Sequence, residues 1–193
     1  MNWGRLALNA GLVIVLFSCA GPSRRDTLQM PYEDRVKLAS IYIQGGQEDR
    51  AIPLLKEAVF QDENRPEAWA MLGELYWLKG DLKVSSNHLQ KALEAGGEDP
   101  VVLNNLAWVE SAKGYPEKAL ALVDRAIARN PAPAFPYLET RARVLMELGR
   151  YEEAAADARA ARSLTPEYDT KMREQLDELL REIYELTGGQ SPP

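Results

Sequence analysis

The sequence has very little cysteine and histidine: Cys19 and His88 are the only residues of their types. A single thiol cannot form a disulfide within the chain, and one histidine with no second histidine or cysteine near it does not make a metal site. The chain also lacks a phosphate-binding glycine loop and a serine in a strand-turn-helix context. We therefore expect no metal, no cofactor, no small-molecule substrate and no catalytic residues, and an enzyme is kept only as an alternative from another function class.

Positive charge is also scarce. The chain has 23 basic against 29 acidic residues, a formal net charge of −6. Nucleic-acid recognition depends on basic patches, so this balance argues against a nucleic-acid partner.

The apolar run near the start, residues 6–17, follows Arg5 and is short. As a helix it would rise about 18 Å, against a hydrocarbon core of about 30 Å. A positive start, a short apolar run and small residues after it are typical of a secretory signal peptide. An uncleaved inner-membrane helix over residues 6–21 is the alternative.

The cysteine lies directly after this run, in the stretch Leu16-Phe17-Ser18-Cys19. This stretch resembles the lipobox of bacterial lipoproteins, with an aliphatic residue at −3, a small residue at −1 and then the cysteine that is acylated. The thiolate is the nucleophile that such acylation needs. More than one acyl chain, palmitate among them, gives a stable membrane anchor. A signal peptide with an incidental cysteine is the alternative.

The lipobox resemblance implies a signal peptide over 1–18 and a lipidated Cys19 that begins a tether over 19–31. The residue after the cysteine is Ala20. Aspartate at that position resembles the inner-membrane retention signal, so alanine favours the outer membrane. We expect the protein to be lipid-anchored there, on the periplasmic face.

Small residues recur through the rest of the chain at intervals of 34, 34 and 35 positions. Because self-similarity at a fixed period is the signature of repeat proteins, the shared spacing indicates stacked units. Three columns have it: Gly46, Gly80, Gly114 and Gly149; Ala51, Ser85, Ala119 and Ala154; Ala58, Ala92, Ala126 and Ala161.

The clearest unit begins at Pro66 and resembles the tetratricopeptide repeat. The matching residues, at positions 4, 7, 8, 11, 20, 24 and 27 of the unit, are Trp69, Leu72, Gly73, Tyr76, Ser85, Leu89 and Ala92. Each unit holds two apolar runs at helical spacing broken by glycine, and one helix pair cannot bury its own apolar face. We expect large residues such as Trp69, Tyr76 and Leu89 to fill the space between adjacent units.

This resemblance implies an all-α fold, a right-handed α-solenoid of four helix-turn-helix repeats plus a capping helix. The repeats begin at Tyr32, Pro66, Pro100 and Phe135. The solenoid spans 32–187, with the cap at 168–187 and a tail at 188–193. The cap is predicted to bury one apolar face, made by Met172, Leu176, Leu179, Ile183 and Leu186.

Some positions depart from the repeat pattern. Arg35, Glu110 and Arg141 occupy core-type positions, and Pro53 falls inside a second helix. An unpaired buried charge is costly, so we expect an ion pair between Glu110 and Arg141 on adjacent first helices. The alternative is that both side chains reach solvent along their stems.

The repeat resemblance also implies a concave groove lined by the first helices. Its predicted partner-binding residues are Met71, Trp77, Asn105, Trp108, Arg143 and Met146. Trp77 and Trp108 are expected to share one trough with Met71, Asn105 and Arg143, because tryptophan is enriched at binding hot spots. Packing of both rings between neighbouring repeats stays open as the alternative. Asn105 is expected to hold a bound peptide backbone, since an amide both donates and accepts.

The expected function is therefore that of an adaptor or scaffold, which binds a segment of an envelope protein in the groove. Five glutamates against one lysine and one arginine in the groove favour basic residues in that segment. Among lipidated repeat proteins the chain is similar to the pilotins of type IV pilus secretins. The alternatives are an adaptor for peptidoglycan hydrolases and a subunit of outer-membrane protein assembly, since the repeat pattern encodes the fold and not the partner.

Overall fold

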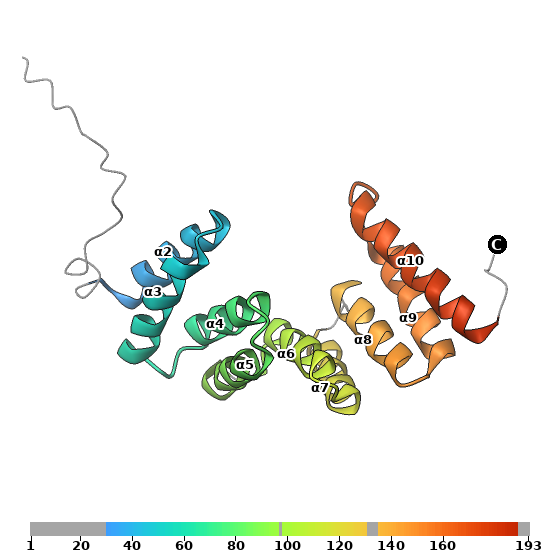
Figure 1. Cartoon of the computed structure of the whole chain (residues 1–193), viewed down its shortest axis with the longest axis horizontal. Coiled ribbons are helices and arrows are strands. Elements are labelled where there is room, and N and C mark those ends of the chain that lie inside the picture. The colour runs from blue at the N-terminus through green and yellow to red at the C-terminus, as the bar shows by residue number, and fades with distance from the viewer. Residues whose placement is uncertain (1–29, 97, 131–134, 189–193) are drawn as a thin grey trace, which may run out of the picture. The chain divides into compact units, whose positions relative to one another are not determined.

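The computed structural model describes residues 30–96, 98–130 and 135–188, and these residues form helices joined by short connections. The described helices belong to one unit, 31–193, and Figure 1 shows them in chain order. They are α2 (Tyr32–Gln44), α3 (Glu48–Gln61), α4 (Pro66–Leu78), α5 (Leu82–Gly96), α6 (Pro100–Ala112), α7 (Pro116–Arg129), α8 (Phe135–Glu147), α9 (Tyr151–Leu164) and α10 (Thr170–Thr187). The predicted signal peptide and Cys19 lie outside the described residues.

These helices form the four predicted repeats. In each repeat the first helix (α2, α4, α6 or α8) packs most extensively on the second helix of the same repeat (α3, α5, α7 or α9). Each second helix also contacts the helix that follows it, so the units stack in sequence order and share their cores. The predicted all-α repeat solenoid is confirmed.

The turn inside each repeat explains the column of glycines. Gly46, Gly80, Gly114 and Gly149 have φ of +66°, +77°, +84° and +72°, in the left-handed region that side chains with a Cβ rarely adopt. Glycine reaches this region at no steric cost. Glycine therefore recurs every 34 or 35 residues because each repeat needs one residue in this left-handed conformation.

The columns of small residues mark where the two helices of a repeat cross closely. Ala51, Ala119 and Ala154 are fully buried, and so is Ser85, whose hydroxyl donates a 2.7 Å hydrogen bond to the carbonyl of Gly73. A Cβ added to Gly73 would lie 2.5 Å from Cγ of Leu89. A side chain there would push α4 and α5 apart, as the sequence pattern predicted.

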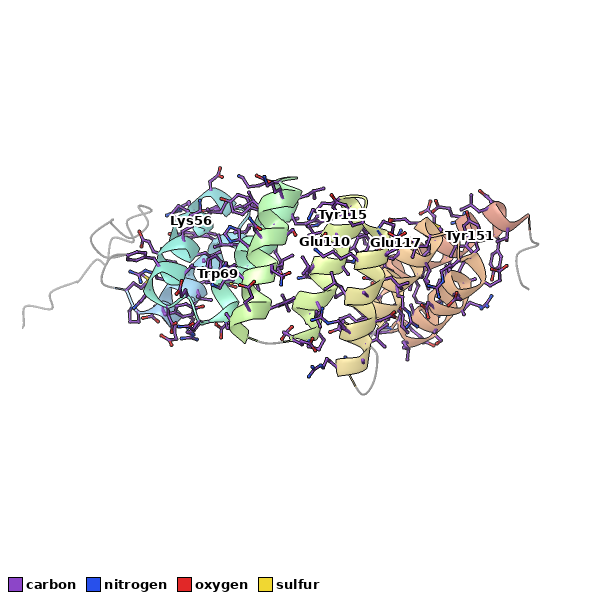
Figure 2. All side chains as sticks on the ribbon, turned by 90° about the horizontal axis from the view of Figure 1, so that it is seen from below. Lys56, Trp69, Glu110, Tyr115, Glu117 and Tyr151 are labelled. Atoms are coloured by element: carbon purple, nitrogen blue, oxygen red, sulfur yellow. The ribbon has the colours of Figure 1, made fainter. Side chains whose placement is uncertain are left out.

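Aromatic residues of the second repeat surround the histidine. Trp69 packs against the cores on both sides of it, and its indole N–H donates to the carbonyl of Glu63 at 2.9 Å. Figure 2 labels Trp69 on α4. The His88 ring lies 5.4 Å from the Trp69 ring and 5.3 Å from the Tyr76 ring. Burial, followed by the charge of Lys56, lowers the His88 pKa.

The first repeat forms in spite of its unusual residues. Pro53 lies inside α3, as expected. Arg35 is buried on α2, where its Nε lies 3.4 Å from the Glu57 carboxylate and its guanidinium donates to the Gln61 side chain. The charge at this core-type position is therefore paired with the second helix of its own repeat.

The capping helix α10 begins two residues later than predicted. Asp169 caps it by accepting a hydrogen bond from the Met172 backbone N–H at 3.1 Å, which satisfies one of the first free amides. Leu176, Leu179 and Ile183 are fully buried against α8 and α9, whereas Leu186 is 54% exposed. The apolar face therefore covers the last repeat and ends before Leu186, which was predicted to share it. Figure 1 shows α10 beside α9.

Glu110 is almost completely buried on α6, and Figure 2 labels it. Its carboxylate accepts hydrogen bonds from the Ser86 hydroxyl and from Lys113 at 2.9 Å, and Lys118 lies 3.3 Å away. Burial raises the Glu110 pKa, but the hydrogen bonds from Ser86 and Lys113 and the nearby Lys118 ammonium lower it by more. The carboxylate is therefore held in its charged form.

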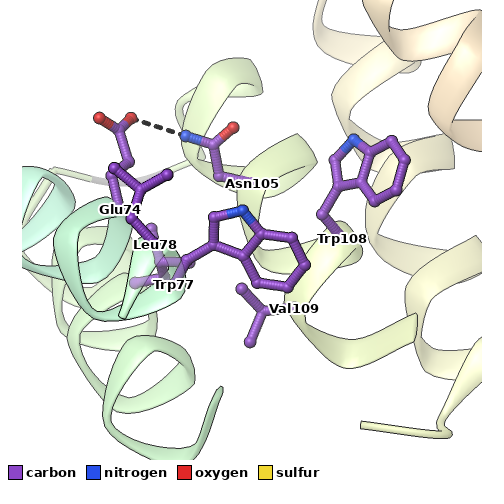
Figure 3. Close-up of a pocket in the computed structure, with 7 residues that line it drawn as sticks. Glu74, Trp77, Leu78, Asn105, Trp108 and Val109 are labelled. Carbon is purple, nitrogen blue, oxygen red and sulfur yellow. Dashed lines mark hydrogen bonds between the residues drawn. The ribbon is translucent and has the colours of Figure 1, made fainter. Parts of the chain in front are cut away.

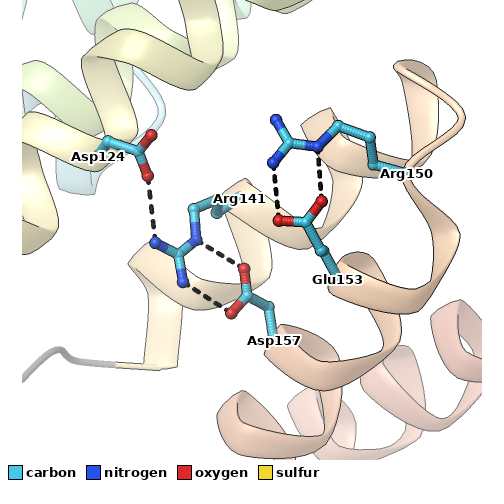
Figure 4. A network of polar contacts seen from close by, with 5 residues as sticks. All are labelled: Asp124, Arg141, Arg150, Glu153 and Asp157. Atoms are coloured by element: carbon cyan, nitrogen blue, oxygen red, sulfur yellow. Dashed lines mark hydrogen bonds and ion pairs between the residues drawn. The ribbon is translucent and has the colours of Figure 1, made fainter.

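Arg141 forms a separate network, which Figure 4 shows. Its guanidinium donates two hydrogen bonds to Asp157 on α9, at 2.6 and 2.8 Å, and one to Asp124 on α7 at 3.1 Å. The hydrogen bonds with Asp157 come first among the causes that raise the Arg141 pKa above its ordinary value.

The predicted ion pair between Glu110 and Arg141 is therefore wrong. Within the described part of the chain, Glu110 pairs with Lys113 at the end of its own helix and with Lys118 on α7, and Arg141 pairs with Asp124 on α7 and Asp157 on α9. The reason is geometric. The side chains of Glu110 and Arg141 both point toward the second helices of their own and the preceding repeat, and not toward each other's first helix.

The turn of the first repeat offers a matched test of the left-handed glycine. We expect Gly46→Ala to reduce the free energy of unfolding by about 1 kcal/mol, because alanine at positive φ is strained. A Cβ at Gly46 meets nothing within 4 Å, so no clash contributes. Gly45→Ala is the control, since Gly45 has φ −87°. Urea denaturation measures both, and equal loss in the two variants would contradict the account.

The two arginines in Figure 4 allow a second test. Arg141→Ala leaves the largely buried Asp157 carboxylate without its partner and should reduce the free energy of unfolding by about 2 kcal/mol. Arg150 pairs with the exposed Glu153, so Arg150→Ala should leave the denaturation midpoint nearly unchanged. A similar effect of the two substitutions would show that the Arg141 network contributes no more than a surface pair.

Candidate binding groove

A hollow of about 480 Å³ opens between the first helices of the second and third repeats, as Figure 3 shows. Three residues of its wall, Trp77, Asn105 and Trp108, were predicted binding residues and are brought together as expected. Tryptophan and branched aliphatic side chains dominate the wall. The residues that line it are Glu74, Trp77 and Leu78 of α4, Leu89 of α5, and Asn105, Trp108 and Val109 of α6.

The two tryptophans are held differently. Trp77 is half-buried and packs against the core of the second and third repeats, so its ring is supported from behind while it lines the hollow. Trp108 is also half-buried, and the Arg143 guanidinium lies 5.8 Å from its ring centroid. Part of the Trp77 ring therefore packs between repeats. Contact of either ring with a partner stays a prediction.

The amide of Asn105 is engaged within the protein. Its Nδ2 donates a hydrogen bond to the Glu74 carboxylate at 2.8 Å, which Figure 3 draws. Partial burial raises the pKa of Glu74, and the hydrogen bond from Asn105 opposes this only in part. The predicted role of Asn105 in holding a peptide backbone stays untested, and the structure gives it the added role of orienting Glu74.

Arg143 borders the same region from α8. Its Nε donates to the Glu139 carboxylate at 3.0 Å while its guanidinium faces Trp108. The Glu139 ion pair holds this cation at the edge of the tryptophan.

Two predicted residues lie elsewhere. Met146 packs against the core of the last repeat and the capping helix. Met71 lines another hollow, between α2 and α4, so the expectation of one trough with Trp77 is wrong. Met71 and Trp77 are six residues apart, and at about 100° per residue they point to different flanks of α4.

The sequence reasoning did not select Leu89 and Val109 as wall residues. Both belong to the repeat core, and each leaves one edge in the hollow. Their positions could have indicated them, because Leu89 occupies position 24 of its repeat, on the second helix, and Val109 follows Trp108 directly. Apolar wall atoms thus come from residues that the fold already requires.

Among the residues that the structure describes, no three histidine, cysteine or acidic side chains gather closely enough to hold a metal ion. None of the described helices has the length and apolar character needed to cross a membrane.

Comparisons with known proteins agree with this architecture. A family model of the tetratricopeptide repeat matches residues 36–100 and 104–169. A search of curated proteins finds no significant match.

Solved structures share the fold at low sequence identity. PilW, described as a widely conserved type IV pilus biogenesis factor, is 18% identical with a TM-score of 0.66, over 80% of this chain and 75% of PilW. PilF of Pseudomonas aeruginosa is 19% identical with a TM-score of 0.65, over 84% and 78% of the two chains.

YrrB, described as a repeat protein with an unusual peptide-binding site, is 21% identical with a TM-score of 0.63, over 81% of this chain and 86% of YrrB. These three structures are similar in fold, and the family match covers most of the solenoid. The chain belongs to the tetratricopeptide repeat family.

Proposed function

We propose that this protein is an adaptor that binds a segment of an envelope protein in the hollow between α4 and α6. The observation that carries the proposal is the wall of that hollow, where Trp77, Trp108 and the 67% exposed Leu78 surround an open space. Exposed aromatic and aliphatic side chains around a concavity are the usual anchors of protein–protein contacts. Solenoids of this kind use their concave surfaces for such binding.

The partner segment brings an apolar side chain into the hollow and a basic residue to its edge. Glu74 is at that edge with a raised pKa, and its neighbour on the wall, Asn105, is a neutral amide. A lysine or arginine beside Glu74 would stabilise the charged carboxylate, which partial burial disfavours. Arg143, facing Trp108 at the opposite edge, receives an acid or stacks on a ring of the partner.

The adaptor works at the periplasmic face of the outer membrane, held by acyl chains on Cys19. This part of the proposal stands on the sequence, where Leu16-Phe17-Ser18-Cys19 resembles a lipobox. Assembly of a type IV pilus or its secretin is the process we favour. The likeness in fold to PilW, described as a pilus biogenesis factor, supports this choice.

Trp108→Ala tests the binding role. We expect it to weaken partner binding by about 2 kcal/mol or more, as for a hot-spot residue, with little effect on the fold. Capture of partners from detergent-solubilised envelope, followed by titration of the captured segment, measures the loss. Trp69→Ala is the matched control, because Trp69 packs against two repeat cores and does not line the hollow. This substitution should lower the melting temperature and leave the affinity unchanged. Lost stability with intact binding in Trp108→Ala would defeat the proposal.

Cys19→Ser tests the anchor. Serine supplies no thiol, so lipidation should be abolished and the protein should leave the membrane fraction or keep its signal peptide. Intact-mass analysis of the wild-type membrane form should show an acylated Cys19 at the mature N-terminus. Any other mature N-terminus would remove the lipoprotein interpretation while leaving the groove unaffected.

A further inference from the structure

A second apolar hollow lies on the other flank of α4, between α4 and α2. It has a volume of about 540 Å³, and its wall includes Val36, Ile41 and Met71. Ile41 is 56% exposed although it is a large aliphatic residue. This hollow and the tryptophan hollow are both built mainly from first helices, so one chain segment that crosses α4 can reach both.

One stripe of α4 connects the two hollows. Glu67, Met71, Glu74 and Leu78 follow one another at intervals of four, three and four residues, which places them along one face of the helix. Glu67 and Met71 line the α2–α4 hollow, and Glu74 and Leu78 line the tryptophan hollow. The hollows are therefore displaced along α4 as well as across it.

The displacement fixes a length for the segment. Met71, which lines one hollow, and Leu78, which lines the other, are about 10 Å apart along the α4 axis at 1.5 Å per residue. The two hollows are therefore separated by about 10 Å or more. An extended chain rises about 3.3 Å per residue and returns to the same face every second residue, so two residues, about 7 Å, are too short, and four residues, about 13 Å, are the shortest spacing on one face that reaches both hollows.

The charge of Glu74 indicates which residue type the middle of the partner segment carries. The acids at the edges of the groove already have cations: Glu67 pairs with Arg65, and Glu139 pairs with Arg143. Glu74 receives a hydrogen bond from Asn105, and no ion pair joins it to a cation within residues 30–96, 98–130 and 135–188. It stands on the α4 stripe between Met71 and Leu78, where the middle of a crossing segment would lie.

We infer that the partner segment is an extended strand with two apolar side chains four positions apart and a lysine or arginine midway between them. One apolar side chain enters the α2–α4 hollow against Ile41, and the other enters the tryptophan hollow against Trp77 and Trp108. The basic side chain pairs with Glu74. This inference rests on the proposed function, because it assumes that the groove binds a segment of another protein.

Synthetic peptides test the spacing. The probe contains Leu-Ser-Lys-Ser-Trp between Gly-Ser flanks. Fluorescence anisotropy measures its affinity for the protein that lacks the predicted signal peptide and carries Cys19→Ser. We expect it to bind about tenfold more tightly than a peptide with serine in place of leucine, since one buried leucine contributes about that factor. Shortening the spacing to three residues should remove the advantage, because the second anchor then faces away.

Variants separate the inference from the proposed function. Ile41→Ser should remove the advantage of the two-anchor peptide over the one-anchor peptide, and Glu74→Gln should remove the preference for lysine over glutamate at the middle position. Phe60→Ser is the matched control, because Phe60 is 94% exposed on α3 and lines neither hollow. It should leave every affinity unchanged.

The outcomes are distinct. Binding that depends on Trp108 but not on peptide spacing or on Ile41 would overturn the two-anchor inference and leave the groove proposal standing. Tighter binding of a peptide whose anchors are seven positions apart, on one face of a helix, would also overturn the extended strand. Absence of binding by every peptide would overturn the two-anchor inference alone, because these probes are designed from it. Binding of the captured partner segment that is unaffected by Trp108→Ala would overturn the groove proposal, and the inference with it.

Discussion

The close crossing of the two helices within each repeat is the constraint on which the other features depend. At each crossing the chain places alanine, serine or glycine, and at Gly73 even a methyl group would collide with Leu89. Because the backbones approach so closely, large side chains are excluded from the crossing and must lie above and below it. There they form the cores shared between repeats, which is why one repeat alone would leave its apolar surface in water.

The same packing decides where charge can be buried. Arg35, Glu110 and Arg141 occupy similar positions on three first helices, and each meets counter-charges or polar groups on second helices. Such pairs offset the cost of burial more than they add stability. Because these charged side chains point toward the second helices, the opposite face of the first helices carries the tryptophan, leucine and isoleucine side chains that line the groove.

The groove is thus made from residues that serve the fold and residues that do not. Trp77 is supported by the core and lines the tryptophan hollow, whereas Leu78 and Ile41 are largely exposed and stabilise little. Exposed aliphatic side chains beside rigid, half-buried rings form a surface whose shape is fixed before a partner arrives. Such preorganisation reduces the ordering cost of association.

The sequence by itself determined the repeat architecture, because its requirements are local and recur once per unit. The left-handed turn at Gly46, the small residue at Ala119 and the periodic apolar runs could each be predicted from residue type and spacing. The convergence of Trp77 and Trp108 followed from the same repeat register. The tertiary structure alone decided which partner each polar side chain takes. Glu110 selects Lys118 instead of Arg141, Asn105 engages Glu74, and Met71 faces α2, because these outcomes depend on distances between helices that the spacing of residues along one helix does not contain.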